Sequence, residues 1–297
     1  MLSILIPTYN YSITDLVEEI HAQITKINIP FEIRCYDDGS TDTAIITSNK
    51  NINNLERTSY YILNKNIGRS AVRNLLAKDA KFDWLLFLDA DVLPKSSDFI
   101  SKYLKTISET SQVIYGGILY SEEKPSQSHL LRWVYGSERE ALSLLKRKEH
   151  NYISFLTLNF LINKNVFSLV SFNEDIPNLR HEDTLFSYNL RLKNVQIEHI
   201  ENPTYHIGLE ESSLFYKKSI ESVDALYYFL NCGIIPRNYT KITRVFFNLK
   251  KYGFHYILAF IYILFKHYFK RNLLSGNPSL FIFDLCRLSY LCHLYTK

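Results

Sequence analysis

Two aspartates directly follow a short apolar segment of this 297-residue chain. Residues 84–88 are all apolar and predict a buried strand, and Asp89 and Asp91 follow it two positions apart. Carboxylate oxygens at a strand end are hard ligands that suit Mg²⁺ or Mn²⁺, and such a cation neutralises the charge of a diphosphate. The pair therefore predicts a divalent metal site.

An earlier acidic pair, Asp37 and Asp38, precedes Gly39 and Ser40 and follows a predicted strand over residues 31–36. In an open α/β sheet, the loops at the carboxyl ends of the strands bind ligands. A carboxylate in such a loop can accept hydrogen bonds from a nucleotide base or a ribose. Asp-Gly-Ser is also ordinary turn chemistry, so the tetrad alone leaves a plain turn equally open.

A glycine turn at residues 64–68 leads into a predicted helix over residues 69–78, which carries Arg69 and Arg73. The start of a helix can receive phosphate oxygens, because its first backbone N–H groups have no partner within the helix. A simple pair of helix caps would give the same pattern. The segment therefore indicates a phosphate site or a cap.

A third acidic pair, Glu182 and Asp183, opens a predicted helix over residues 182–193, and His206 follows further along the chain. Acids at a helix start are favoured by the helix dipole, so capping by itself explains this pair. A lone histidine is more often structural than a metal ligand. From their types alone, these residues leave a catalytic base and a cap both open.

The elements that must position these residues alternate along the first 200 residues, which predicts a layered α/β domain. We expect strands at residues 3–7, 31–36, 59–63, 84–88 and 112–119, and helices at residues 13–27, 69–78, 99–109 and 182–193. Residues 121–128, rich in Ser, Glu and Pro, predict an exposed loop. The acidic pairs thus follow strands or begin helices.

The composition is that of a folded protein, with 46% apolar and 22% charged residues. Lys and Arg number 34 against 30 acids, so the net charge gives no argument for a nucleic-acid partner. The four cysteines form no Cys-x-x-Cys pair, so neither a disulfide framework nor a zinc site is expected. With no signal peptide after Met1, we expect a cytoplasmic location.

The basic character belongs to the C-terminal part, beyond a predicted helix over residues 213–230. Residues 241–297 contain nine Lys or Arg and only one acid, Asp284, which leaves 25 against 29 before them. Residues 252–265 lack charged residues, but as a helix they would extend only about 21 Å, less than a bilayer core of about 30 Å. The basic residues on the two sides of this uncharged segment are Lys250, Lys251, Lys266, Lys270 and Arg271. This pattern predicts a segment in the membrane interface; a pair of buried helices is the alternative.

Taken together, the motifs resemble the family 2 glycosyltransferases of the GT-A fold over residues 1–208. The matching segments are Ile6-Pro7-Thr8-Tyr9-Asn10, Asp37-Asp38-Gly39-Ser40-Thr41-Asp42, residues 64–74, Asp89-Ala90-Asp91 and Glu182-Asp183, in that order. The resemblance implies an α/β nucleotide-diphospho-sugar transferase fold, with a Rossmann-like mixed sheet flanked by helices. Residues 209–240 would then be a connecting helix and linker, and residues 241–297 a helical membrane-interface segment.

The resemblance also implies a role for each motif. The residues that would bind the nucleotide are Pro7, Tyr9, Asp37, Asp38, Arg73 and Asp89. Asp91 would bind Mn²⁺ or Mg²⁺ directly, with Asp89 facing both ribose and metal and His206 as a candidate further ligand. Asp183 would be the general base of an inverting transfer. Two departures from the family pattern are Cys35-Tyr36 before the first acidic pair and Arg180-His181 before the last.

We therefore expect a metal-dependent inverting glycosyltransferase that uses a nucleotide-sugar donor. A UDP-sugar is favoured because Asp38 can accept a hydrogen bond from a uracil imide, and GDP and dTDP stay open. The expected acceptor is a lipid-linked or cell-surface glycan, at the anionic inner face of the cell membrane. Two alternatives are a catalytically silent sugar-nucleotide-binding partner and a phosphatase, since Asp89 to Leu93 also resembles the nucleophile motif of haloacid-dehalogenase-type phosphatases.

Overall fold

The computed structural model describes residues 1–175 and 180–297. Its contacts divide the chain into two compact units. The described residues of the first unit are 1–121, 140–175 and 182–208, and those of the second are 122–139, 180–181 and 209–297. The second unit therefore combines the C-terminal helices with a segment that lies between two parts of the first unit along the chain.

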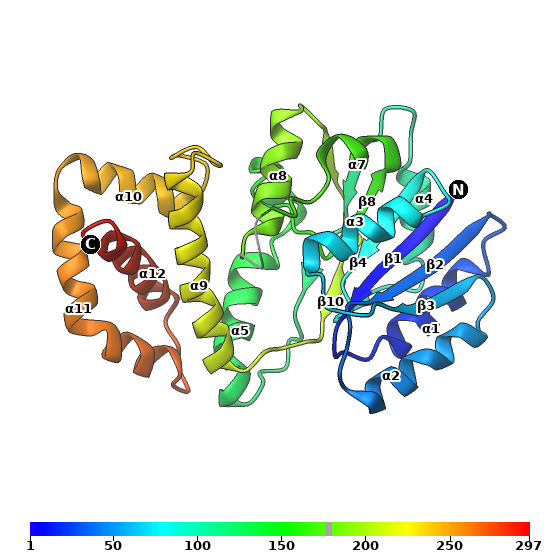
Figure 1. The fold of residues 1–297 in the computed structure, drawn as a ribbon, viewed down its shortest axis with the longest axis horizontal. Coiled ribbons are helices and arrows are strands. Elements are labelled where there is room, and N and C mark those ends of the chain that lie inside the picture. Colours follow the sequence, from blue (N-terminus) through cyan, green and yellow to red (C-terminus); the bar gives the residue numbers. More distant parts are fainter. Residues whose placement is uncertain (176–179) are drawn as a thin grey trace. The chain divides into compact units, whose positions relative to one another are not determined.

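A seven-stranded mixed sheet forms the centre of the first unit (Figure 1). Its strands, in spatial order, are β3 (Thr58–Ile62), β2 (Phe31–Asp37), β1 (Leu2–Thr8), β4 (Trp84–Leu88), β8 (Asn159–Asn163), β6 (Val113–Tyr115) and β9 (Ile197–His199). The four strands from β3 to β4 are parallel, whereas β8 runs antiparallel to both β4 and β6. The mixed α/β architecture predicted from the sequence is confirmed.

The strand register brings the predicted motifs to one edge of the sheet. Thr8 at the end of β1 lies opposite Asp37 at the end of β2, and Leu5 of β1 lies opposite Phe87 of β4. Because the three strands are parallel, their carboxyl ends lie side by side. The loops that carry the first two acidic pairs therefore leave the sheet from the same edge.

Helices flank this sheet because their apolar residues recur at helical spacing. They are α1 (Thr14–Ile24), α2 (Thr43–Lys50), α3 (Arg69–Asp79), α4 (Phe99–Thr106), α6 (Leu144–Glu149), α7 (Lys164–Val170) and α8 (Glu182–Leu192), with a 3₁₀ turn at Asn51–Asn54. In α1, for example, Leu16, Val17 and Ile20 are buried. Stacked rings extend the core, with Phe87 and Phe160 5.0 Å apart between ring centroids. The expected helices at residues 13–27, 69–78, 99–109 and 182–193 are thus present with shifted ends.

The strand expected at residues 112–119 is divided in the structure between the central sheet and a second, three-stranded sheet. The second sheet contains β5 (Val92–Pro94), β10 (Thr204–His206) and β7 (Ile118–Leu119), in that order. The prediction of one strand was wrong, because β6 and β7 belong to different sheets and two glycines separate them. Gly117 has φ +97°, and a Cβ on Gly116 would approach the Asn202 carbonyl oxygen to 2.2 Å. The chain therefore turns sharply at these two residues.

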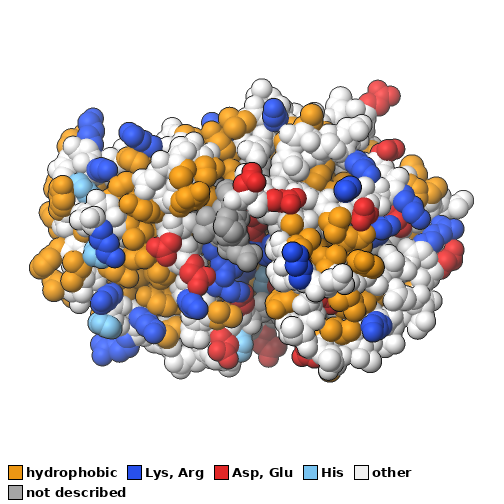
Figure 2. Space-filling model, in the orientation of Figure 1, with side chains coloured by type: hydrophobic (Ala, Val, Ile, Leu, Met, Phe, Trp, Pro, Cys, Tyr) orange, Lys and Arg blue, Asp and Glu red, His pale blue; other side chains and the backbone are white. Residues whose placement is uncertain are grey.

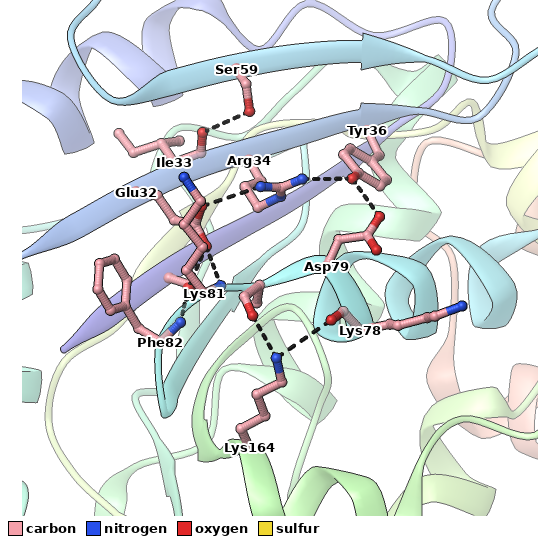
Figure 3. Close-up of polar contacts among 12 residues, drawn as sticks. Glu32, Ile33, Arg34, Tyr36, Ser59, Lys78, Asp79, Lys81, Phe82 and Lys164 are labelled. Atoms are coloured by element: carbon pink, nitrogen blue, oxygen red, sulfur yellow. Dashed lines mark hydrogen bonds and ion pairs between the residues drawn. The ribbon is translucent and has the colours of Figure 1, made fainter.

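A polar network ties β2 to the segment between α3 and β4 (Figure 3). The buried Glu32 carboxylate accepts hydrogen bonds from Arg34 and from the Lys81 backbone. Arg34 also donates to the Tyr36 hydroxyl at 2.9 Å, and that hydroxyl donates to Asp79 at 2.7 Å. The unusual tyrosine before the first acidic pair therefore has a structural role, because it holds the end of α3 against β2.

The second unit is helical. Its elements are a 3₁₀ turn at Gln127–His129, α5 (Leu130–Tyr135), α9 (Ser212–Asn231), α10 (Lys241–Lys251), α11 (Phe254–Leu273) and α12 (Leu280–Leu294); a π-helical turn at Gly136–Glu140 follows α5. Helix α12 contacts α9, α10 and α11. Within the described residues, no helix combines the length and the apolar composition that crossing a membrane requires.

Candidate functional site

Asp89, at the end of β4, forms an ion pair with Arg73 of α3. Its Oδ1 atom lies 2.5 Å from Arg73 Nη2, and its backbone N–H donates to the Leu158 carbonyl at 3.0 Å. Arg73 is only 5% exposed, and its guanidinium also lies over the Phe172 ring. Burial opposes the charged form of Arg73, but the carboxylates of Asp89 and its neighbours outweigh burial and raise the pKa of Arg73. A fixed positive charge therefore stands at the strand end.

Asp91 lies beside His206, as the pairing of β5 with β10 requires. His206 is opposite Val92 in that pair, and its Nε2 atom is 3.5 Å from Asp91 Oδ2. Gly208 makes room for this carboxylate, because a Cβ there would come within 2.6 Å of the Asp91 side chain. The Ile207 N–H donates to the Asp91 carbonyl at 2.9 Å. Two residues predicted as metal ligands are thus brought together by non-local strand pairing.

Tyr120 connects His206 to the surroundings of Asp183. The rings of Tyr120 and His206 stack with centroids 5.3 Å apart, and the Tyr120 hydroxyl donates to the Glu140 carboxylate. Burial and the negative charge of Glu140 raise the pKa of Asp183, against the opposing effects of the Thr184 N–H and of Arg69. A carboxylate with a raised pKa is a stronger base than an ordinary aspartate.

The start of α8 also interacts with the start of α3. Glu182 Oε1 lies 2.8 Å from Arg69 Nη1, and both Glu182 and Asp183 act on the charge of Arg73. For the start of α3, the sequence predicted either a phosphate site or a cap. The structure adds ion pairing as a third role of this segment. Its two arginines lie among carboxylates from β4 and α8.

The acidic pair after β2 is largely internal. Asp37 is fully buried, and its carboxylate accepts hydrogen bonds from the Ser40 N–H at 2.7 Å and from the Tyr60 hydroxyl. The Asp38 carboxylate accepts from the N–H groups of Ile67 and Gly68, at 2.7 and 3.0 Å. Burial raises the pKa of Asp38, and these two N–H groups oppose that shift. Both aspartates therefore stabilise turns at the sheet edge.

The loop after β1 joins the same edge. Tyr9 is 49% exposed there, whereas Pro7 is only half-buried within β1. Asn10 follows with φ +48°, and its Oδ1 atom accepts hydrogen bonds from the N–H groups of Thr41 and Asp42. Asn10 thus links the loops after β1 and β2, a role that sequence reasoning did not assign to it.

The structure brings some predicted site residues together and separates others. Asp91 and His206 are neighbours, whereas Asp89 forms an ion pair with Arg73. The described part of the chain contains no group of three His, Cys, Asp or Glu residues that could hold a metal ion. Sequence reasoning missed Tyr120 and Glu140. Neither residue stands in a motif, so no local pattern could have indicated them.

Comparison with known proteins identifies the family. The sequence profile described as "Glycosyl transferase family 2" matches residues 3–176. An uncharacterized glycosyltransferase of Haemophilus influenzae is 26% identical over 187 residues, which cover 63% of this chain and 70% of the relative. Chondroitin synthase of Pasteurella multocida is 34% identical over 119 residues, which cover 39% of this chain but only 12% of that enzyme.

Two solved structures share the fold. The mannosyltransferase PcManGT of Pyrobaculum calidifontis, in complex with GDP-Man and Mn²⁺, has a TM-score of 0.52 at 14% identity, covering 77% of this chain and 64% of that one. S. aureus TarS 1–349, in complex with UDP-GlcNAc, has a TM-score of 0.50 at 21% identity, covering 76% and 66%. This chain thus spans slightly less than two thirds of each. With a mixed sheet that matches these enzymes and a family profile over more than half of its length, the chain belongs to glycosyl transferase family 2 and has the GT-A fold.

Proposed function

We propose that this glycosyltransferase is metal-dependent and transfers a sugar, with inversion, from a nucleotide-sugar donor to a lipid-linked or cell-surface glycan. The observation that carries the proposal is the set of contacts that joins Asp91, His206, Tyr120 and Glu140, together with the effect of the Glu140 charge on the pKa of Asp183. These interactions support a single site that contains a candidate metal ligand and a candidate base with a raised pKa. The donors bound by the two solved relatives, GDP-Man and UDP-GlcNAc, support a nucleotide sugar.

Asp183 is the proposed general base. The acceptor hydroxyl oxygen attacks the anomeric carbon, and its proton passes to the Asp183 carboxylate. As the new carbon–oxygen bond forms, the bond from the anomeric carbon to the phosphate oxygen breaks, and the nucleoside diphosphate leaves with that electron pair. Because burial and Glu140 raise the pKa of Asp183, its carboxylate accepts the proton more readily than an exposed aspartate.

Asp91 and His206 are the residues that would hold the divalent cation. Their oxygen and nitrogen donors lie 3.5 Å apart and suit Mn²⁺, and Mg²⁺ commonly uses one or two carboxylates together with substrate phosphates. When bound, such a cation stabilises the negative charge that develops on a departing diphosphate. Arg73 adds a fixed positive charge to the same region, and its ion pair keeps Asp89 at the strand end.

The proposed nucleotide site lies at the carboxyl edge of the parallel strands. Tyr9 is exposed there beside Pro7, and Asp38 keeps acceptor capacity beyond the one N–H bonded to each of its oxygens. We favour a UDP-sugar because a carboxylate at this position can accept from a uracil imide. Asp37 supports this site by holding the turn after β2, and Asp89 is the proposed ribose contact.

A panel of UDP-, GDP- and dTDP-sugars tests this function. Binding is measured by calorimetry with and without Mn²⁺, and turnover by release of the nucleoside diphosphate with oligosaccharide or glycolipid acceptors. We expect one donor to bind in a Mn²⁺-dependent manner and to be consumed. Donor binding without turnover across the acceptor panel would favour the silent-partner alternative. Hydrolysis of p-nitrophenyl phosphate without any donor binding would favour the phosphatase alternative.

We also propose a location for the acceptor. Residues 241–297 carry nine Lys or Arg and one acid, which supports peripheral binding to an anionic membrane surface, at the cytoplasmic face of the cell membrane. Residues 1–208 would supply the catalytic domain and residues 209–240 its connection to this basic segment. A lipid-linked or membrane-proximal glycan would then lie close to the enzyme.

A further inference from the structure

Helix α11 exposes a continuous apolar face to solvent. Six of its large apolar or aromatic residues are more than half exposed, and apart from Phe254 at the helix start they are Tyr256, Ile257, Phe260, Ile263 and Leu264. The spacing of the last five along the sequence places them on one side of an α-helix. We refer to these five residues as the α11 face. Solvated apolar residues are ordinary when single, but a contiguous stripe of this kind indicates an interaction surface.

The opposite side of α11 is held within the second unit. His255, Ala259, Phe269 and Leu273 are buried, and α11 contacts α12 and α10 (Figure 1). The helix is therefore fixed by its packed side, which leaves the α11 face available for a partner. At about 1.5 Å per residue, the α11 face extends about 12 Å along the helix, from Tyr256 to Leu264.

Basic side chains flank the α11 face at both ends. Lys250 and Lys251 precede it, and Lys266, Lys270 and Arg271 follow its apolar residues. The single acid of residues 241–297, Asp284, is bonded to Arg139 at 2.9 Å within the same unit. Figure 2 shows hydrophobic and basic side chains together over the left part of the view, where Figure 1 draws α11. The surface therefore combines apolar area with positive charge.

We propose that the α11 face is the membrane-contacting surface of the protein, with the helix axis parallel to an anionic bilayer. The apolar side chains would enter the boundary between headgroups and acyl chains, and the basic residues at both ends would contact lipid phosphates. This inference rests on the membrane location in the proposed function and assigns that location to particular residues. A second copy of the chain is a poorer occupant, because facing copies would bring their basic ends together.

Vesicle flotation with the full-length chain tests the assignment. Neutral phosphatidylcholine vesicles are compared with vesicles containing phosphatidylglycerol, at low and high salt. We expect binding to the anionic vesicles that weakens with salt. Phe260→Ser with Leu264→Ser should weaken this binding about tenfold or more, since each loses a large apolar side chain. Lys266→Ser and Lys270→Ser should each weaken it about fivefold, the equivalent of one surface charge.

The control is Leu145→Ser with Leu169→Ser. Both leucines are strongly exposed, at 77% and 66%, but they belong to the first unit, so vesicle binding should not change. Because all substituted side chains are exposed, thermal unfolding should stay as in the natural chain. Donor binding is measured in parallel and should be the same in every variant. A loss of vesicle binding with intact donor binding then supports the α11 face independently of glycosyl transfer.

Three results would overturn the assignment. A natural chain that ignores anionic vesicles would remove the membrane location as well as the α11 face. Anionic binding that survives all four substitutions would leave the location but place it on another surface. A dimer in analytical ultracentrifugation that Phe260→Ser dissociates, without vesicle binding by the natural chain, would show that a second copy covers this face.

Discussion

Asp183 is the residue on which transfer should depend most. We predict that Asp183→Asn lowers the transfer rate by about 10² or more, the usual effect of losing a positioned base, while donor binding stays nearly intact. Single-turnover transfer and donor calorimetry measure the two quantities. Asp98→Asn is the control, because Asp98 also stands at a helix start but is exposed and directly precedes α4. If Asp183→Asn keeps full transfer activity, Asp183 is only a cap.

The pH dependence of transfer gives a second test of the same residue. The pKa of Asp183 is raised above the ordinary 3.8 by burial and by Glu140, so the rate should fall as the pH decreases through this raised pKa. Glu140→Gln removes one negative charge and should lower the pKa of Asp183, moving the acidic limb of the kcat profile to lower pH. An unchanged limb, or a shift to higher pH, would contradict the coupling between Glu140 and Asp183.

Substitution of Gly208 tests the position of the Asp91 side chain while Asp91 itself stays unchanged. A Cβ at residue 208 would lie 2.6 Å from the Asp91 side chain, so Gly208→Ala must displace that carboxylate from His206. We predict that Mn²⁺-dependent donor binding weakens about tenfold or more, since this displacement disturbs the proposed cation ligands. Gly276→Ala is the matched control, because its nearest atom would lie at an ordinary 3.6 Å. Equal donor affinity in the two variants would show that the Asp91 position is unimportant.

Single residues also show where sequence reasoning stops. The types of Asp89 and Asp91 predicted a cation site, but the partner of each depends on the fold: Arg73 for the first and His206 for the second. The departure Arg180-His181 places a histidine at φ +77°, in a backbone region in which glycine is favoured. Nothing in the sequence indicated that a histidine adopts this conformation here.

At the scale of elements, the strands that carry motifs were predictable and the short ones were not. The apolar run at residues 84–88 became β4 with the same bounds, because a strand in the middle of a sheet that is covered on both faces is apolar on both faces. Strand β8 lies in an apolar stretch that periodicity cannot assign to a helix or a strand. The three-stranded sheet depends on pairing between distant segments, which no local pattern encodes.

His199 of β9 should make the first unit sensitive to acid. Burial lowers the pKa of His199 to about 4, and the residue is 2% exposed. Its Nε2–H donates to the Asn151 carbonyl at 2.9 Å, whereas the buried Nδ1 atom meets no acceptor among the described residues. Protonation would therefore place an unbonded N–H in the core. Since the unfolded chain binds the proton first, stability should fall as the pH decreases from about 6.5 towards 4.

Denaturant unfolding at several pH values measures this effect. His199→Gln keeps a donor for Asn151 but cannot be protonated, so its stability should change less between pH 6.5 and 4 than that of the natural chain. His150→Gln is the control, because His150 is exposed and should leave the pH dependence unchanged. If the His199 variant loses stability with acid as steeply as the natural chain does, another group is responsible.

At the scale of the whole molecule, charge and chemistry are divided along the chain. The candidate catalytic residues belong to the first unit, whereas the basic, aromatic-rich helices belong to the second. The composition shift after residue 240 was visible in the sequence. The sequence did not indicate that residues 122–139 join the C-terminal helices, because that association depends on contacts such as the bond from the Leu131 N–H to Ser212. Local sequence patterns therefore predict the helices and strands of each unit better than they predict which segments of the chain form that unit.

The cation-dependent nucleotide site is the claim on which the proposed function rests, and calorimetry of UDP and GDP binding with and without Mn²⁺ tests it most directly. We predict that the natural chain binds one nucleotide much more tightly with Mn²⁺, and that Asp91→Ala removes this gain because the cation loses a carboxylate ligand. Glu109→Ala, an exposed acid in the same unit, should behave like the natural chain. Nucleotide binding that is indifferent both to Mn²⁺ and to Asp91→Ala would contradict a cation site at Asp91.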